Sequence, residues 1–120
     1  MKIQDYPKQI ESASLDLAAT VEELSETRDR IEDAKVEALN AVITARTEDG
    51  KPVHTNDKAR DIALHFALRS DSSYCQDCAT VRILEHKRAT LEAEIERLRR
   101  EYRIALIDYE RAELGRLDAA

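Results

Sequence analysis

The clearest structural pattern of this sequence lies in residues 81–112, which read VRILEHKRATLEAEIERLRREYRIALIDYERA. Apolar residues recur alternately three and four positions apart, with one charged residue on the line. The line consists of Val81, Leu84, Arg88, Leu91, Ile95, Leu98, Tyr102, Ala105, Tyr109 and Ala112. This spacing is typical of a helix that packs lengthwise on another helix. We therefore expect a long helix over residues 74–113, with Gly115 just past its end as a C-terminal cap.

A second long helix is expected over residues 7–47, because Pro7 suits a first helical turn and an apolar residue follows at every seventh position. These residues are Ile10, Leu17, Leu24, Ile31, Ala38 and Ala45. The two helices have almost equal lengths, so an antiparallel hairpin would pair residues whose numbers sum to about 120. In that register Tyr102 and Tyr109 lie opposite Ala13, Ala18 and Ala19. Arg88 lies opposite three acids, and we expect it to pair with Asp29, Glu32 or Asp33 and so to help fix the register.

Between the long helices the sequence predicts a turn and a short helix. Gly50 and Pro52 mark a turn over residues 48–56, and the capping residues 55–57 begin a helix over residues 57–69. Ala59, Ile62, Ala63 and Phe66 would form its apolar face. Residues 70–73 read SDSS, which predicts a break or kink, with Ser73 and Gln76 as a capping box. One continuous helix is the alternative.

Composition supports an all-α fold in a single helical domain, residues 1–120. Of the 120 residues, 37% are charged and 42% hydrophobic, and two glycines and two prolines are too few for the turns of a β-sandwich. The sequence contains no run of eighteen apolar residues, so we expect no membrane span. The residues after Met1 lack the apolar core of a signal peptide, so we expect none. We expect a cytoplasmic protein without a membrane partner. The net charge of -6 disfavours non-specific nucleic-acid binding.

A two-helix hairpin is thin, and the first helix carries more apolar surface than one seam needs. We expect the surplus to form an interface together with residues of the short helix. The expected interface residues are Val36, Leu39, Val42, Ile43, Ile62 and Phe66. A two-fold dimer would complete a four-helix bundle, because one patch then serves both subunits. In the alternative, residues 57–69 fold back over the patch and give a three-helix monomer.

Chemistry-bearing residues are few. Cys75 and Cys78 form a lone CxxC at a helix start, where two ordinary thiols are the simpler interpretation and a redox pair or half of a zinc site is the alternative. No acid, base and nucleophile come together in the sequence, so we expect neither an enzyme nor a cofactor.

Charged residues gather in two places. Arg97, Arg99, Arg100 and Arg103 form a basic cluster, which is either a surface paired with nearby glutamates or a strip that contacts phosphate. The first helix carries the acidic counterpart. Its acids are Glu22, Glu23, Glu26, Asp29, Glu32, Asp33 and Glu37. Such a face can repel nucleic acid or mimic it toward a basic protein.

Three segments resemble short coiled-coil proteins of phages and prophages. They are DGKPVHTNDKAR at residues 49–60, Ser73-Tyr74, and the heptad helix that ends in LRREY at residues 98–102. The resemblance implies a helical hairpin and an accessory role near DNA recombination or replication. The CxxC does not belong to that pattern. We therefore expect a helical protein-interaction module that binds another protein, or alternatively an acidic inhibitor that mimics nucleic acid.

Overall fold

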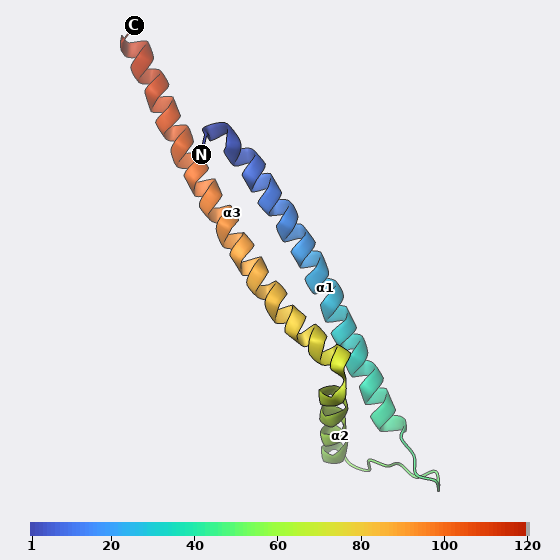
Figure 1. Cartoon of the computed structure of the whole chain (residues 1–120). Helices are drawn as coiled ribbons and strands as arrows, with labels where there is room; N and C mark the ends of the chain where they lie inside the picture. The colour runs from blue at the N-terminus through green and yellow to red at the C-terminus, as the bar shows by residue number, and fades with distance from the viewer. Residues whose placement is uncertain (120) are drawn as a thin grey trace. The chain divides into compact units, whose positions relative to one another are not determined.

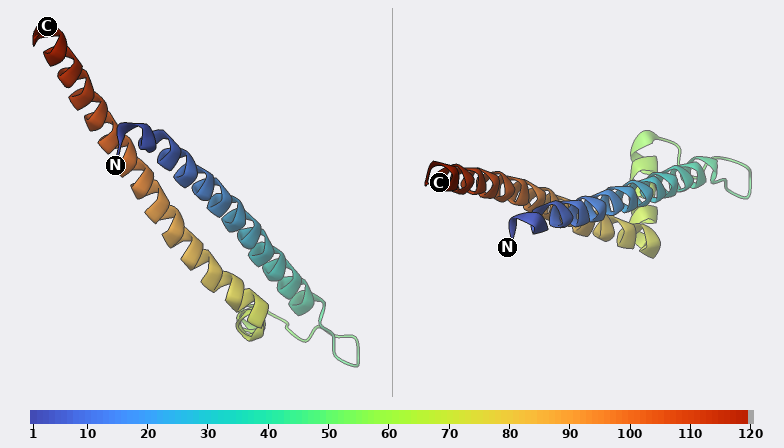
Figure 2. Two further views of the ribbon diagram at one scale, coloured as in Figure 1. Left: turned by 45° about the horizontal axis from the view of Figure 1, so that its top comes forward. Right: turned by 90° about the horizontal axis from the view of Figure 1, so that it is seen from above.

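A computed structural model describes residues 1–119 and confirms an all-α helical hairpin. A 3-10 turn, η1 (Ile3–Asp5), leads into α1 (Tyr6–Thr44). A loop and the short helix α2 (Asp57–Ser70) connect α1 to α3 (Ser72–Ala119) (Figure 1). Helices α1 and α3 run antiparallel (Figure 2). The chain packs as two compact units. The terminal unit contains residues 1–22 and 85–119, and the central unit contains residues 23–84.

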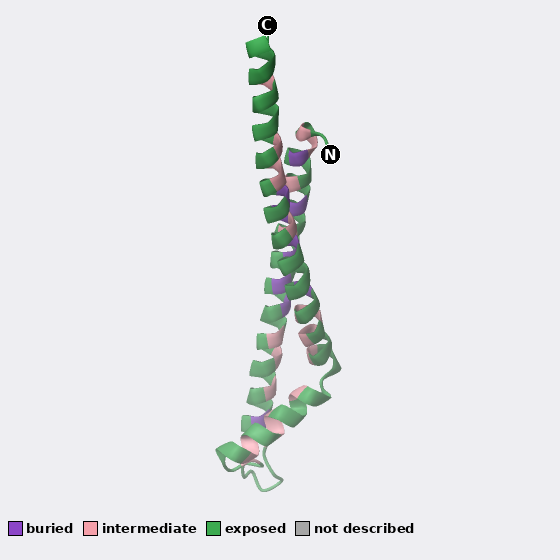
Figure 3. Cartoon of the chain, turned by 90° about the vertical axis from the view of Figure 1, so that its left-hand side faces the viewer, coloured by how far each residue is buried: buried purple, intermediate pink, exposed green. Residues whose placement is uncertain are grey.

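In the terminal unit, the core lies between residues 6–22 of α1 and residues 85–119 of α3 (Figure 3). Tyr6, Ala13 and Thr20 of α1 are buried, as are Leu91, Ile95 and Leu98 of α3. The α3 residues belong to the expected heptad line, so that part of the line is confirmed. Further along, Tyr109 is exposed, although the heptad line places it in a seam.

In the central unit, the buried side chains are Leu24, Thr27, Val42 and Leu84. Helix α2 contributes half-buried residues to this unit, namely Ala59, Ala63, Leu64 and Leu68. The predicted apolar face of the short helix is therefore confirmed for two of its four residues. Ala59 and Ala63 lie inward, whereas Ile62 and Phe66 lie on the exposed side.

The hairpin register differs from the expected one. In the terminal unit, the rings of Tyr6 and Tyr102 meet edge to face with their centroids 5.6 Å apart. In the central unit, Arg30 Nη2 lies 3.4 Å from Asp77 Oδ1. Both contacts join residues whose numbers sum to about 108 rather than about 120, so Tyr102 packs on a tyrosine and not on Ala18.

The two helices do not pair end to end. In the observed register the start of α3 at Ser72 lies level with Val36 of α1, well before the end of α1 at Thr44, so matching the helix ends gave the wrong register. In the terminal unit α3 continues beyond the start of α1 (Figure 2), which leaves the side chains of Tyr109, Leu114 and Leu117 exposed. Gly115 lies inside α3 without a positive φ, so the expected cap at this glycine is wrong.

A break separates α2 from α3, as the SDSS segment predicts, but a different residue forms the cap. Asp71 is extended, with φ -84° and ψ 105°. Its Oδ1 accepts a hydrogen bond of 3.1 Å from the backbone N–H of Tyr74. Ser73 already lies within α3, so the expected capping box of Ser73 and Gln76 is wrong.

The loop after α1 begins three residues earlier than expected. Thr47 N–H donates to the carbonyl of Lys51 at 2.8 Å, and Gly50 N–H donates back to the carbonyl of Thr47 at 2.9 Å. Gly50 has φ 80°, a left-handed conformation that a residue without a Cβ adopts at little cost. These bonds close a tight turn, and the chain then returns to Asn56, whose side chain caps α2.

Candidate interaction surfaces

An exposed apolar stripe follows the last third of α1. Val36, Leu39 and Ile43 are 66%, 41% and 47% exposed. Their spacing of three and four places them on one face of the helix. Val42, which the sequence assigned to the same interface, is buried in the central unit instead. We call Val36, Leu39 and Ile43 the α1 stripe.

The outer face of α2 carries the two other expected interface residues. Ile62 is 62% exposed and Phe66 is 72% exposed. A hollow of about 510 Å³ lies on this face. It is lined by Asp61, Ile62, His65, Phe66 and Arg69. Five of the six expected interface residues are thus exposed, and they lie on two different helices of the central unit.

An acidic row runs along α1 in the central unit. Glu26, Asp29, Asp33 and Glu37 are all exposed, and spacings of three and four residues place them on one helix face. Glu32, beside the row, forms an ion pair of 3.4 Å with Lys35. The row itself presents carboxylates to solvent.

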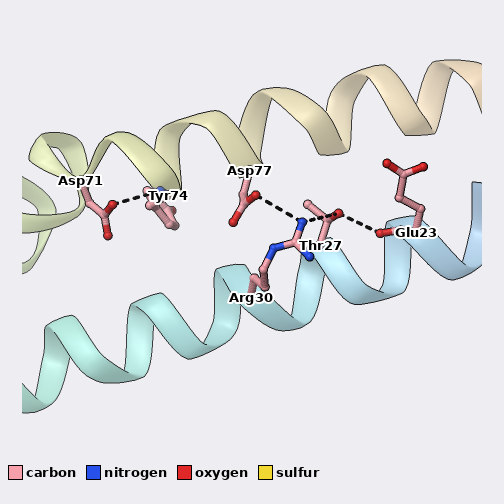
Figure 4. A network of polar contacts seen from close by, with 6 residues as sticks. All are labelled: Glu23, Thr27, Arg30, Asp71, Tyr74 and Asp77. Atoms are coloured by element: carbon pink, nitrogen blue, oxygen red, sulfur yellow. Dashed lines mark hydrogen bonds and ion pairs between the residues drawn. The ribbon is translucent and has the colours of Figure 1, made fainter.

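A polar network joins α1 to α3 in the central unit (Figure 4). Arg30 Nη2 donates to Thr27 Oγ1 at 3.2 Å and to Asp77 Oδ1 at 3.4 Å. The Thr27 hydroxyl donates to the backbone carbonyl of Glu23 at 2.8 Å, so this fully buried side chain is satisfied. The network could have been found by extending the heptad line backward from Val81, since Asp77 and Tyr74 continue the spacing of four and three.

Arg88 lies in the terminal unit and makes a different contact from the expected one. Its Nε pairs with Glu92 Oε1 at 3.0 Å, one turn further along α3. Asp33 is an exposed member of the acidic row in the central unit. In the central unit, an ion pair between Arg30 and Asp77 joins α1 to α3. Arg30 was not predicted, because it lies outside the apolar spacing of α1.

Both cysteines are free thiols near the start of α3. Cys75 is exposed and Cys78 is half-buried. The Cys75 Sγ lies 3.6 Å from the carbonyl oxygen of Arg69, at the end of α2. A hydrogen bond with Cys78, and then burial, raise the pKa of the Tyr74 phenol above its ordinary value of 10.0. Within residues 1–119, no three His, Cys, Asp or Glu side chains converge as metal ligands.

The basic cluster divides into paired and unpaired arginines. Arg97 pairs with Glu101 at 2.9 Å. Arg99, Arg100 and Arg103 make no ion pair with any described residue, and they line a hollow of about 510 Å³ in the terminal unit. Glu92 and Glu96 line the same hollow, so its surface carries both signs of charge.

No protein-family model, curated protein or solved structure matches this chain. Among residues 1–119, no helix combines the length and apolar character that crossing a membrane requires.

Proposed function

We propose that this chain is a non-enzymatic helical interaction protein that binds another protein through the α1 stripe. The observation that carries this proposal is the exposure of Val36, Leu39 and Ile43 on one helix face. Exposed apolar side chains that lie next to one another are more common at protein interfaces than on the rest of a protein surface. Three side chains at this spacing also match the anchors of a helix that packs on a partner helix.

The resemblance to phage coiled-coil proteins supports a role beside DNA recombination or replication. In that role the chain contacts a protein of the DNA-processing machinery and leaves the nucleic acid to its partner. The net charge of -6 supports a role in which the partner, and not this chain, contacts the nucleic acid, since it disfavours direct contact with phosphate.

A pair of leucine variants tests the α1 stripe. Leu39→Asp places a charge in the stripe, whereas Leu15→Asp makes the same change at an exposed leucine elsewhere on α1. We expect proteins captured from the source cell and identified by mass spectrometry to be lost with Leu39→Asp and retained with Leu15→Asp. The same set of captured proteins with both variants would contradict the proposal.

The acidic row supports a second candidate function, an inhibitor that mimics nucleic acid. Four exposed carboxylates on one face of α1 resemble the regular charge of a phosphate backbone. A competition assay separates the two candidates. A mimic displaces DNA from the captured partner, and Asp29→Asn with Asp33→Asn weakens the displacement. An accessory protein binds the partner equally well with and without DNA.

A further inference from the structure

The outer face of α2 exposes the single phenylalanine of the chain. The opposite side of α2 is half-buried through Ala59, Ala63, Leu64 and Leu68. Phe66 and Ile62 therefore lie on the side of α2 that faces away from the packed part of the central unit. Two large apolar side chains on such a face need an explanation, because exposed apolar patches usually mark contacts with other molecules.

The same face consists of two adjacent rows of side chains. Residues four apart form ridges on a helix, with a groove between neighbouring ridges. Ile62 and Phe66 form an apolar row, and Asp61, His65 and Arg69 form a charged row beside it. All five side chains line the hollow of about 510 Å³. A ridge of a second helix can enter the groove between the two rows.

Two copies of the charged row complement one another when they run antiparallel, because opposite charges then lie side by side. Asp61 and Arg69 lie eight residues apart, about 12 Å along the helix, with His65 midway. Neither Asp61 nor Arg69 forms an ion pair with another described residue, whereas the nearby Arg60 pairs with Asp57 at 3.5 Å. A two-fold axis at His65 would bring each Asp61 level with Arg69 of a second copy.

We propose that the outer face of α2 is the contact surface for a second copy of this chain, with the two α2 helices antiparallel. Ile62 of each copy packs on Phe66 of the other, and two symmetric ion pairs join Asp61 to Arg69. An isologous contact requires one patch that is complementary to itself, and the reversed charge row supplies it. This proposal goes beyond the proposed function, because it names a different face and a different partner.

Only five residues per copy form this contact, fewer than the 20–30 per side of a standard interface. The dimer is therefore weak and depends on concentration. We expect half-association at roughly 100 µM, which is typical of small transient interfaces. Sedimentation equilibrium up to about ten times that concentration measures the mass against the 13.7 kDa of one chain.

Charge reversal tests the antiparallel arrangement directly. Asp61→Arg and Arg69→Asp each place like charges opposite one another, and we expect each to weaken association about tenfold or more. The double variant restores opposite charges in exchanged positions, so we expect it to recover association. Asp108→Arg, the same change on an exposed residue of the terminal unit, serves as the matched control and should leave the mass unchanged.

A single-chain mass at every concentration would overturn the proposal. A dimer that tolerates both single reversals, or a double variant that stays monomeric with its helix content intact, would overturn it as well. Phe66→Ala provides a second readout. It should abolish association while the chain still captures partners through the α1 stripe. A dimer that survives Phe66→Ala but dissociates with Leu39→Asp would assign the second copy to the α1 stripe instead, which also overturns the proposal.

Discussion

Thr20 and Thr27 show how a polar residue can occupy a core position of a helical hairpin. Each hydroxyl donates to the backbone carbonyl four residues earlier, Asp16 or Glu23, at 2.8 Å. The hydroxyl is thereby satisfied inside the helix, and the side chain is almost fully buried. Apolar character alone does not indicate that either threonine belongs to the core. They alternate with Leu17 and Leu24 at spacings of three and four, and this spacing could have predicted that both threonines are buried.

We expect Tyr74 to make a contribution to the stability of the central unit that is lost at alkaline pH. The folded chain raises the pKa of this phenol above 10.0 through the hydrogen bond with Cys78 and through burial. The folded state therefore favours the neutral phenol. The resulting stabilisation is complete below pH 10 and is lost as the pH rises through the raised folded-state pKa. Tyr74→Phe removes this contribution, so the stability difference from the parent chain should change above about pH 10.

Chemical denaturation between about pH 9 and pH 12, with phenolate absorbance followed in parallel, measures the effect. Tyr109→Phe, at an exposed tyrosine of the terminal unit, is the matched control. If Tyr74→Phe leaves the pH dependence of the unfolding free energy above about pH 10 the same as in the parent chain, the raised pKa of Tyr74 is wrong.

The heptad line predicted α3, the apolar residue at every seventh position predicted α1, and the SDSS segment predicted the break between α2 and α3. The register was not predictable in the same way. Matching Tyr102 with alanines is a plausible size rule, but the contact of Tyr102 with Tyr6 gives an aromatic edge-to-face pair instead. Several registers satisfy a heptad seam equally well, because the a/d spacing repeats every seven residues.

Cysteine crosslinking distinguishes the two registers. In a chain with Cys75→Ser and Cys78→Ser, a short bismaleimide should join cysteines placed at Tyr6 and Tyr102 rapidly, within one chain. The matched control places cysteines at Ala18 and Tyr102. Ala18 lies about 18 Å along α1 from Tyr6, so this pair should react much more slowly. Faster crosslinking of the control pair, with helix content unchanged, would favour the register derived from the sequence.

The candidate interface was predictable in part. Val36, Leu39 and Ile43 stand out because they exceed what one seam needs, and the structure leaves them exposed. The outward position of Ile62 and Phe66 was not predictable, because α2 is short and its alanines and leucines form an equally good inward face. Val42 was misassigned for a similar reason. It follows the apolar stripe in sequence, but the central unit encloses it.

We expect the terminal unit and the central unit to unfold together. Helix α1 continues without interruption from Glu22 into Glu23, and α3 continues from Leu84 into Glu85. Unravelling either unit therefore removes the helical neighbours of the other, and helix formation is cooperative. Leu98 in the terminal unit and Leu24 in the central unit are each 1% exposed. Replacing either by alanine should cost about 2–5 kcal/mol of the free energy of unfolding.

Hydrogen exchange measured by mass spectrometry at low protein concentration checks this coupling. Leu98→Ala should lower amide protection in peptides of both units, and Leu24→Ala should do the same. Ile83→Ala, which shortens an exposed side chain of α3, is the matched control and should change stability by about 0.5 kcal/mol or less. Loss of protection confined to the unit that carries the substitution would show that the shared helices do not couple the two units. In that case the break would fall inside α1 and α3, near Glu22 and Glu85, where the two units divide.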